Sequence, residues 1–319
     1  MNKYVRKKSL EGFFVFLLLV LDMVCSKCYN TYMKNYNFCN DVKLIRQCFG
    51  MTQMEFAKEV GLSRSNIARY EANQIIPRKD AIEKIYNYSF SHGFDLNKAK
   101  SMIYEDNKGK KAILFHGAKN EMNGEPDTKH STPPNDFGNG FYLGQTLTQA
   151  NMWICPYHNS STYCFYFDYT ALKKMEFDVD YSWMYIILYY RGELDEYELP
   201  KELIKLIDQV ERVDYIIAPI ADNQMYDTIE AFRNNLISDV ACLHALNANN
   251  LGKQFVFKSE KSCKKLETVD RFYLCSKEKE YYLSLKYNSS LDGKNKTSLA
   301  IAKYRKEGRM FNEIFKKKR

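Results

Sequence analysis

The chain has 319 residues, a net charge of +8, and hydrophobic side chains at 45% of its positions. That length favours two domains over one. The apolar content is sufficient for packed cores, which excludes a chain that is disordered throughout. The positive charge is compatible with an anionic partner, although many ordinary globular proteins are as basic.

The cysteines indicate a reducing environment. There are nine of them, an odd number at irregular spacing, in a chain too long to need disulfide bonds for stability. Cys25 and Cys28 form a lone CxxC pair without a second pair or a histidine at zinc-finger spacing. We therefore expect reduced thiols, a cytoplasmic location and no metal site.

Residues 1–40 have the composition of a targeting segment. Basic residues precede an apolar run from Phe13 to Leu21, as in the first two regions of a signal peptide. The run is shorter than the ~20 apolar residues that span a membrane. We expect a signal-like or dispensable extension here. A translation start placed too early, a membrane anchor and a buried helix remain open as alternatives.

Residues 41–95 show the pattern of several short amphipathic helices. Gly50 ends the first, and Thr52 with Glu55 forms a capping box that starts the second. Gly61 marks a tight turn, and Ser63 is placed to cap a third helix over residues 64–71. A fourth helix is expected at about residues 79–88. A helix, a short turn and a second helix predict a helix-turn-helix domain.

Residues 51–73, MTQMEFAKEVGLSRSNIARYEAN, resemble the Cro/Xre-type helix-turn-helix of phage repressors. The resemblance implies binding to an operator-type DNA duplex. The polar residues expected at the DNA are Gln53, Ser63, Arg64, Ser65, Asn66, Arg69 and Asn73. Arginine and asparagine can form bidentate hydrogen bonds with guanine and adenine edges, and Gln53 and Asn73 suit phosphate contacts. Basic and acidic residues nearly balance over this domain, so a solvated polar face is the alternative.

Beyond residue 95 the pattern changes. Residues 96–111 are polar and predict a linker. Residues 112–268 predict a mixed α/β domain, with strands at 112–115, 163–169, 213–218 and 254–258. Helices are expected at about 145–154, 181–191, 200–210, 223–233, 238–248 and 259–266. Residues 269–319 predict a basic helical tail.

Two short motifs in the α/β part carry a second resemblance. A strand ends in His116-Gly117, and Phe137-Gly138-Asn139-Gly140 later opens into Phe141-Tyr142-Leu143. A helix that closes on Trp153 follows. This arrangement resembles the NAD-binding core of ADP-ribosyltransferases of the poly-ADP-ribose-polymerase type, and a family of uncharacterised bacterial domains in the same superfamily. The resemblance implies a split, strongly bent α/β (α+β) sheet and NAD as the substrate.

The resemblance also implies roles for individual residues. His116 would contact a ribose hydroxyl, Gly117 and Gly140 would let the backbone approach the nicotinamide, and Tyr142 and Trp153 would stack on it. Gln254 falls where chain-building relatives carry glutamate. Glutamine can hydrogen-bond a ribose but cannot act as a base. The alternative is that His116 and Tyr142 are ordinary structural residues.

The sequence thus predicts a multidomain protein: an all-α helix-turn-helix followed by an ADP-ribosyltransferase-like domain. The expected function is NAD-dependent mono-ADP-ribosyl transfer or NAD hydrolysis, in a self-repressing toxin or a defence effector. The expected partners are operator DNA, NAD, an acceptor macromolecule and a second copy of the chain. A non-catalytic regulator that senses NAD or a related nucleotide is the alternative favoured by Gln254, and a transferase that modifies nucleic-acid bases is a third.

Overall fold

The computed structural model describes residues 37–318 apart from 123, 130, 132, 133 and 250. The predicted N-terminal extension therefore lies outside the described residues, except for its last four positions. Those positions correct the predicted boundary at residue 40. Helix α2 (Phe38–Cys48) begins there, and the Phe38 ring packs edge-on against Tyr70 with 5.3 Å between ring centroids. Phe38 is therefore part of the helical core.

The helix-turn-helix has the layout that the sequence predicts. Helices α3 (Gln53–Glu59) and α4 (Arg64–Glu71) follow α2, and α5 (Lys79–Ser91) packs against α2. The capping box of Thr52 and Glu55 is present, and Ser63 Oγ accepts a hydrogen bond from the Asn66 amide at 3.1 Å. Gly61 turns the chain between α3 and α4 at a φ of +64°. A left-handed residue without a side chain is favourable at such a turn.

Residues 96–107, predicted as the first part of a linker, instead form helix α6 (Leu96–Asn107). The Asp95 side chain caps it by accepting a hydrogen bond from the Lys98 amide at 2.9 Å. The inner face of α6 buries Leu96, Asn97 and Lys100. The composition indicated a solvated segment because two of these three residues are polar, but tertiary partners bind the Asn97 amide nitrogen and the Lys100 ammonium.

The α/β part of the chain is built on one mixed sheet. Within the described residues, seven strands lie in the order β4-β5-β6-β2-β1-β3-β7. In chain order they are β1 (Ala112–Ala118), β2 (Phe141–Gly144), β3 (Ser161–Phe167), β4 (Lys174–Glu176), β5 (Tyr215–Pro219), β6 (Lys253–Phe257) and β7 (Leu266–Tyr273). The β4–β5 pair is parallel, and the other neighbours are antiparallel.

The sheet continues past the predicted domain end at residue 268, because β7 runs from Leu266 to Tyr273. The helix expected at 259–266 is shortened to α12 (Glu260–Cys263), and the chain then pairs with β3 as the last strand of the sheet. Charged residues such as Asp270 and Arg271 made the second half of this strand resemble a tail. An edge strand tolerates such residues because one side and part of each face remain open to polar partners.

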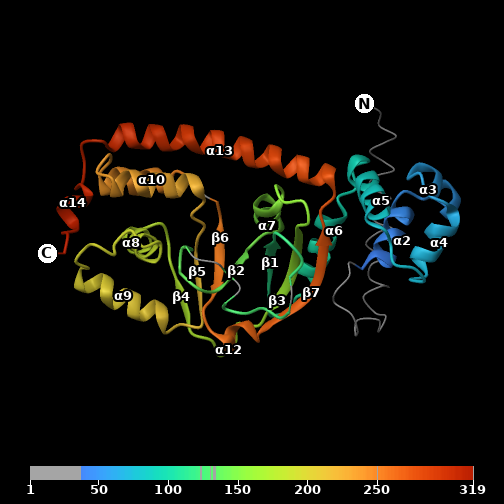
Figure 1. Cartoon of the computed structure of the whole chain (residues 1–319), viewed down its shortest axis with the longest axis horizontal. Helices are drawn as coiled ribbons and strands as arrows, with labels where there is room; N and C mark the ends of the chain where they lie inside the picture. Colours follow the sequence, from blue (N-terminus) through green and yellow to red (C-terminus); the bar gives the residue numbers. More distant parts are fainter. Residues whose placement is uncertain (1–36, 123, 130, 132–133, 250, 319) are drawn as a thin grey trace.

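Helices cover the sheet unequally (Figure 1). Helix α7 (Leu147–Ile154) packs on β1, while α8 (Tyr181–Tyr190), α9 (Lys201–Glu211), α10 (Asn223–Arg233) and α11 (Asp239–Asn247) enclose the core near β4, β5 and β6. The predicted tail contains α13 (Ser276–Tyr304), which begins beside α5 and runs past α7 to α11. Helix α14 (Phe311–Ile314) places Phe311 in the core beside α10. Among the described residues, no helix combines the length and apolar character that crossing a membrane requires.

Candidate functional site

Helix α4 presents a polar face at the outer end of the molecule. Arg64, Ser65 and Arg69 are exposed, whereas Ile67 and Tyr70 point into the helical core. This division follows from the helical repeat, since residues three or four apart share a face. Within the described part of the chain, neither guanidinium is held by an ion pair. Both arginines are therefore available to an anionic partner.

The other residues predicted at the DNA differ in the contacts that they make within the protein. Ser63 uses its hydroxyl to cap α4, and Asn73 follows that helix with a left-handed φ of 52°. Gln53 Nε2 donates to Glu71 Oε2 at 2.8 Å, and the buried Glu71 also pairs with Arg46 at 2.5 Å. The Gln53 amide is thus held within the domain, where it joins the start of α3 to the end of α4.

In the sheet, the side chain of His116 contacts the main chain of Tyr142. His116 Nδ1 donates to the Tyr142 carbonyl oxygen at 2.8 Å, and its ring stacks on Phe141 with 4.5 Å between centroids. The Tyr142 hydroxyl donates to Gly138 O at 2.7 Å and accepts from the Phe137 amide at 3.2 Å. Burial raises the pKa of Tyr142 well above its ordinary value, so this phenol stays protonated.

Two of the predicted cofactor-binding glycines are required by packing. A Cβ on Gly117 would lie 2.7 Å from Ile154 Cγ2 and 2.8 Å from the Ala150 carbonyl oxygen. A Cβ on Gly140 would lie 2.9 Å from Val256 Cγ1. The glycines therefore allow α7 and β6 to approach their neighbours closely, whatever else binds there.

Trp153 lies beside Gly117 and remains accessible. Its Cδ1 atom would be 3.4 Å from a Cβ on Gly117, yet 56% of the side chain is exposed. The Lys119 ammonium lies 5.6 Å from the indole centroid. An exposed aromatic ring next to a glycine backbone can accept a flat ring by stacking, as the sequence predicts for this pair.

Gln254 is buried in a polar cluster that sequence reasoning missed. Its Nε2 donates to Asp136 Oδ2 at 2.9 Å and to the Pro219 carbonyl oxygen at 3.0 Å. Asp136 also accepts from Arg191 Nη2 at 2.6 Å, and the Arg191 guanidinium lies 4.1 Å from the Tyr226 ring centroid. Asp136 directly precedes the Phe137-Gly138 turn, but no signal in the sequence connects it with Arg191 or Gln254.

The three residues predicted to be catalytic do not share one face of the sheet. Tyr142 pairs with Val256, so Tyr142 and Gln254 lie two residues apart on neighbouring strands and point to the same side. Tyr142 packs against the core that contains Val256. The His116 ring stacks on Phe141, which belongs to the core on the opposite side. Tyr142 and Gln254 therefore lie on one face of the sheet, and the His116 ring lies on the other.

The described residues contain no cluster of three or more His, Cys, Asp or Glu side chains that could hold a metal ion. Comparison with protein families gives two matches. Residues 42–88 match the family described as helix-turn-helix, and residues 112–268 match the family described as protein of unknown function DUF3990. No curated protein and no solved structure matches the chain. The first match agrees with the helices α2–α5, while the second names no activity for the α/β part.

Proposed function

We propose that this protein is a sequence-specific DNA-binding regulator that recognises its operator through α4. The observation that carries this proposal is the exposed face of α4, where Arg64, Ser65 and Arg69 project from the second helix of a helix-turn-helix. In such a motif the second helix enters the major groove, and side chains near its start contact base edges. Arginine is suited to this role because it forms two parallel hydrogen bonds with guanine.

The ends of the motif would set its position on the duplex. Ser63 and Asn73 lie at the two ends of α4, where phosphates approach a helix that occupies the groove. Gln53 has a different role in this proposal, because its amide is bound to Glu71. Its effect on affinity would come from holding α3 against α4. Replacing Gln53 would therefore weaken binding to all sequences to a similar extent.

The test is a selection from random DNA duplexes with the full chain, followed by binding measurements on the enriched site. Arg64→Ala and Arg69→Ala should each cost about 1–3 kcal/mol of binding free energy if they contact bases, and should relax the preference at one position. Arg212→Ala is the matched control, because Arg212 is also exposed but lies at the end of α9, where it pairs with Asp208. Enrichment of no motif, or an equal loss in the Arg212 variant, would contradict the proposal.

For the α/β part, we infer that NAD is the ligand and that mono-ADP-ribosyl transfer is its reaction. The accessible Trp153 beside the Gly117 backbone supports this inference, because nicotinamide is a flat ring that binds by stacking. Gln254 would position a ribose hydroxyl without acting as a base. A transferase joined to an operator-binding domain would be able to repress its own promoter, as a toxin or defence effector does.

Trp153 is the most informative residue for testing this second function. Tyr142→Ala would remove a partly buried ring that also fixes Gly138 and Phe137, so a loss of activity would not separate folding from chemistry. Trp153→Ala removes a largely exposed ring. It should reduce NAD affinity in calorimetry and nicotinamide release by about five- to 150-fold, because stacking contributes ~1–3 kcal/mol. Tyr169→Ala, which removes another half-exposed ring, is the control.

The outcomes distinguish the two classes of function. Binding of NAD without release of nicotinamide would favour the non-catalytic regulator that senses the nucleotide. Absence of both binding and release would reject the NAD inference and leave the DNA-binding proposal unaffected, because that proposal rests on α4 alone.

A further inference from the structure

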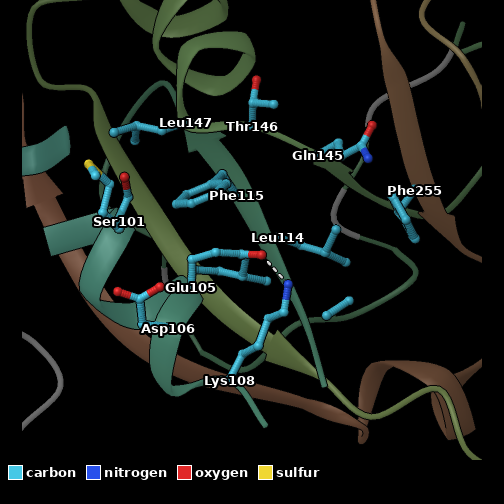
Figure 2. Close-up of a pocket in the computed structure, with 13 residues that line it drawn as sticks. Ser101, Glu105, Asp106, Lys108, Leu114, Phe115, Gln145, Thr146, Leu147 and Phe255 are labelled. Atoms are coloured by element: carbon cyan, nitrogen blue, oxygen red, sulfur yellow. Dashed lines mark hydrogen bonds and ion pairs between the residues drawn. The ribbon is translucent and has the colours of Figure 1, made fainter. Parts of the chain in front are cut away.

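A cleft of about 580 Å³ lies between helix α6 and the first strand of the sheet (Figure 2). Helix α6 and the turn after it supply one wall, β1 supplies the floor, and the start of α7 with part of β6 supplies the far wall. The lining residues are Ser101, Met102, Glu105, Asp106, Lys108, Ala112, Ile113, Leu114, Phe115, Gln145, Thr146, Leu147 and Phe255. This volume lies within the range of about 300–1,000 Å³ that is typical of small-molecule sites.

The cleft exists because β2 leaves β1 early. The two strands pair only at Phe115 and Gly144, after which the chain turns into α7. β1 is paired with β3 along its full length on its other side. Among the described strands, none pairs with residues 112–114 on the side that β2 has left. The space beside them is bounded instead by α6 and by Gln145 and Thr146 (Figure 2).

The floor of the cleft is apolar. Ile113, Leu114, Phe115 and Leu147 line it, and Phe255 extends it toward β6. Leu114, Phe115 and Leu147 are also buried core residues, so the floor is fixed by packing on its inner side. The apolar surface that a ligand could cover comes from the partly exposed Ile113 and Phe255 and from Met102 on α6. This surface favours a ligand with an apolar body, because binding then removes apolar surface from water.

The wall formed by α6 carries a net negative charge. Glu105 and Asp106 both line it, and Lys108 forms an ion pair with Glu105 (Figure 2). Within the described residues, Asp106 has no ion pair. Helix α6 ends at Asn107, so its last carbonyl groups add partial negative charge at the same place. Gln145 and Thr146, on the far wall, are polar but uncharged.

We propose that this cleft binds a small amphipathic cation, with its apolar body on the β1 floor and its positive group beside Asp106. The proposal is independent of the two functions proposed above, because the exposed face of α4 is elsewhere and neither Trp153 nor Gln254 lines the cleft. The ligand would contact Ser101 and Met102 on α6. The neighbouring Lys100 is bound to Asp41 of α2 and Asp270 of β7, so the site lies at the junction of the helical and α/β parts.

Two dyes with the same fused-ring body and opposite charge test the proposal on the full chain. Rhodamine 6G carries a positive charge and fluorescein a negative charge, and fluorescence anisotropy reports the binding of each. Rhodamine 6G should bind more tightly than fluorescein. Asp106→Asn should weaken rhodamine 6G binding by about two- to five-fold, as expected for one partly exposed charge pair. Asp178→Asn, which removes an 89% exposed carboxylate elsewhere, should leave it unchanged.

Two further variants show whether the dye occupies the cleft. Ser101→Trp places a large ring in the space and should weaken rhodamine 6G binding by at least ten-fold. Gln145→Arg adds a positive charge to an exposed position on the far wall, so it should weaken rhodamine 6G and strengthen fluorescein. Circular dichroism checks that each variant is folded. Equal affinity for both dyes, or unchanged rhodamine 6G binding by the folded Ser101→Trp or Gln145→Arg variant, would overturn the proposal.

Discussion

Two buried amide side chains, Gln254 and Asn97, donate hydrogen bonds to partners that lie far away along the chain. Gln254 donates to Asp136 across a separation of 118 residues. Asn97 Nδ2 donates to the Tyr273 carbonyl oxygen at 2.7 Å and to the Glu278 carboxylate at 2.9 Å. A buried polar group without a partner costs about 1–3 kcal/mol, so such pairs constrain how distant segments pack.

Glu278 gives a prediction about pH at this scale. Burial raises the pKa of Glu278 well above its ordinary value. The folded state therefore binds this proton more tightly than the unfolded state does. The resulting stabilisation is complete below the ordinary carboxyl pKa and is lost as the pH rises through the folded pKa. Glu278→Gln keeps the shape without the charge, so it should raise the free energy of unfolding at pH 8 by about 1–3 kcal/mol.

Urea unfolding of both proteins at several pH values measures this effect. The two stabilities should converge near pH 4, where Glu278 is protonated in both states. Glu280→Gln is the control, because Glu280 lies on the same helix with a side chain that is 62% exposed. Parallel stability curves for the Glu278 variant and the wild type would show that this carboxyl is ionised without cost.

Among the elements, α6 shows how a polar segment becomes part of the core. Lys100 Nζ lies 3.1 Å from Asp41 Oδ1 on α2 and 2.7 Å from Asp270 Oδ2 on β7. Tyr86 donates to Asp41, and Tyr104 donates to Asp270 at 2.7 Å. Burial alone would lower the pKa of Lys100, but the carboxylates of Asp270 and Asp41 raise it, so the ammonium remains charged. The helix therefore connects α2 to the edge of the sheet.

Lys100→Met should lower the free energy of unfolding by about 3–5 kcal/mol, because it leaves two buried carboxylates near each other without a cation. Adding Asp41→Asn and Asp270→Asn to that variant should recover most of the loss, since the remaining groups are then neutral. Lys98→Met on the exposed face of α6 is the control and should change stability by less than about 0.5 kcal/mol. Denaturant unfolding measures all of them, and a similar small loss for Lys98 and Lys100 would show that the buried cluster is unimportant.

At the scale of the whole molecule, the helical and α/β parts share a core. Tyr273 and Cys275, which lie at the end of β7 and before α13, are packed with Phe38 and Ile45 of α2. Helix α13 then contacts α5 at one end and α10 and α11 farther along (Figure 1). The segment expected to be a linker is inside this arrangement. We therefore expect the two parts to unfold together.

Limited trypsin digestion checks this expectation. Cleavage after Lys98 or Lys100 should follow global unfolding, because both residues lie within α6 and Lys100 is buried. Lys110, in the exposed turn after α6, provides an accessible site in the same digest. Mass spectrometry of the early fragments identifies the cut sites. Early cleavage inside α6 that releases a stable helical fragment would indicate two independent units.

Local patterns in the sequence were sufficient for the features that depend on neighbouring residues. The capping box at Thr52, the Gly61 turn and the Ser63 cap predicted the helix-turn-helix, because each is formed by residues within a few positions of one another. The periodicity of residues 112–258 likewise predicted most strands and helices of the α/β part.

The tertiary structure alone decided the features that depend on distant partners. Residues 96–107 form a packed helix where the sequence predicted a linker, because Lys100 pairs with Asp41 and Asp270. The tertiary structure placed Gln254 against Asp136 and put the His116 ring on the other face of the sheet from Tyr142. The cleft beside β1 is likewise visible only in the tertiary structure. The physical reason is common to these cases: burial of a polar group is favourable only beside its partner, and the fold determines which partner that is.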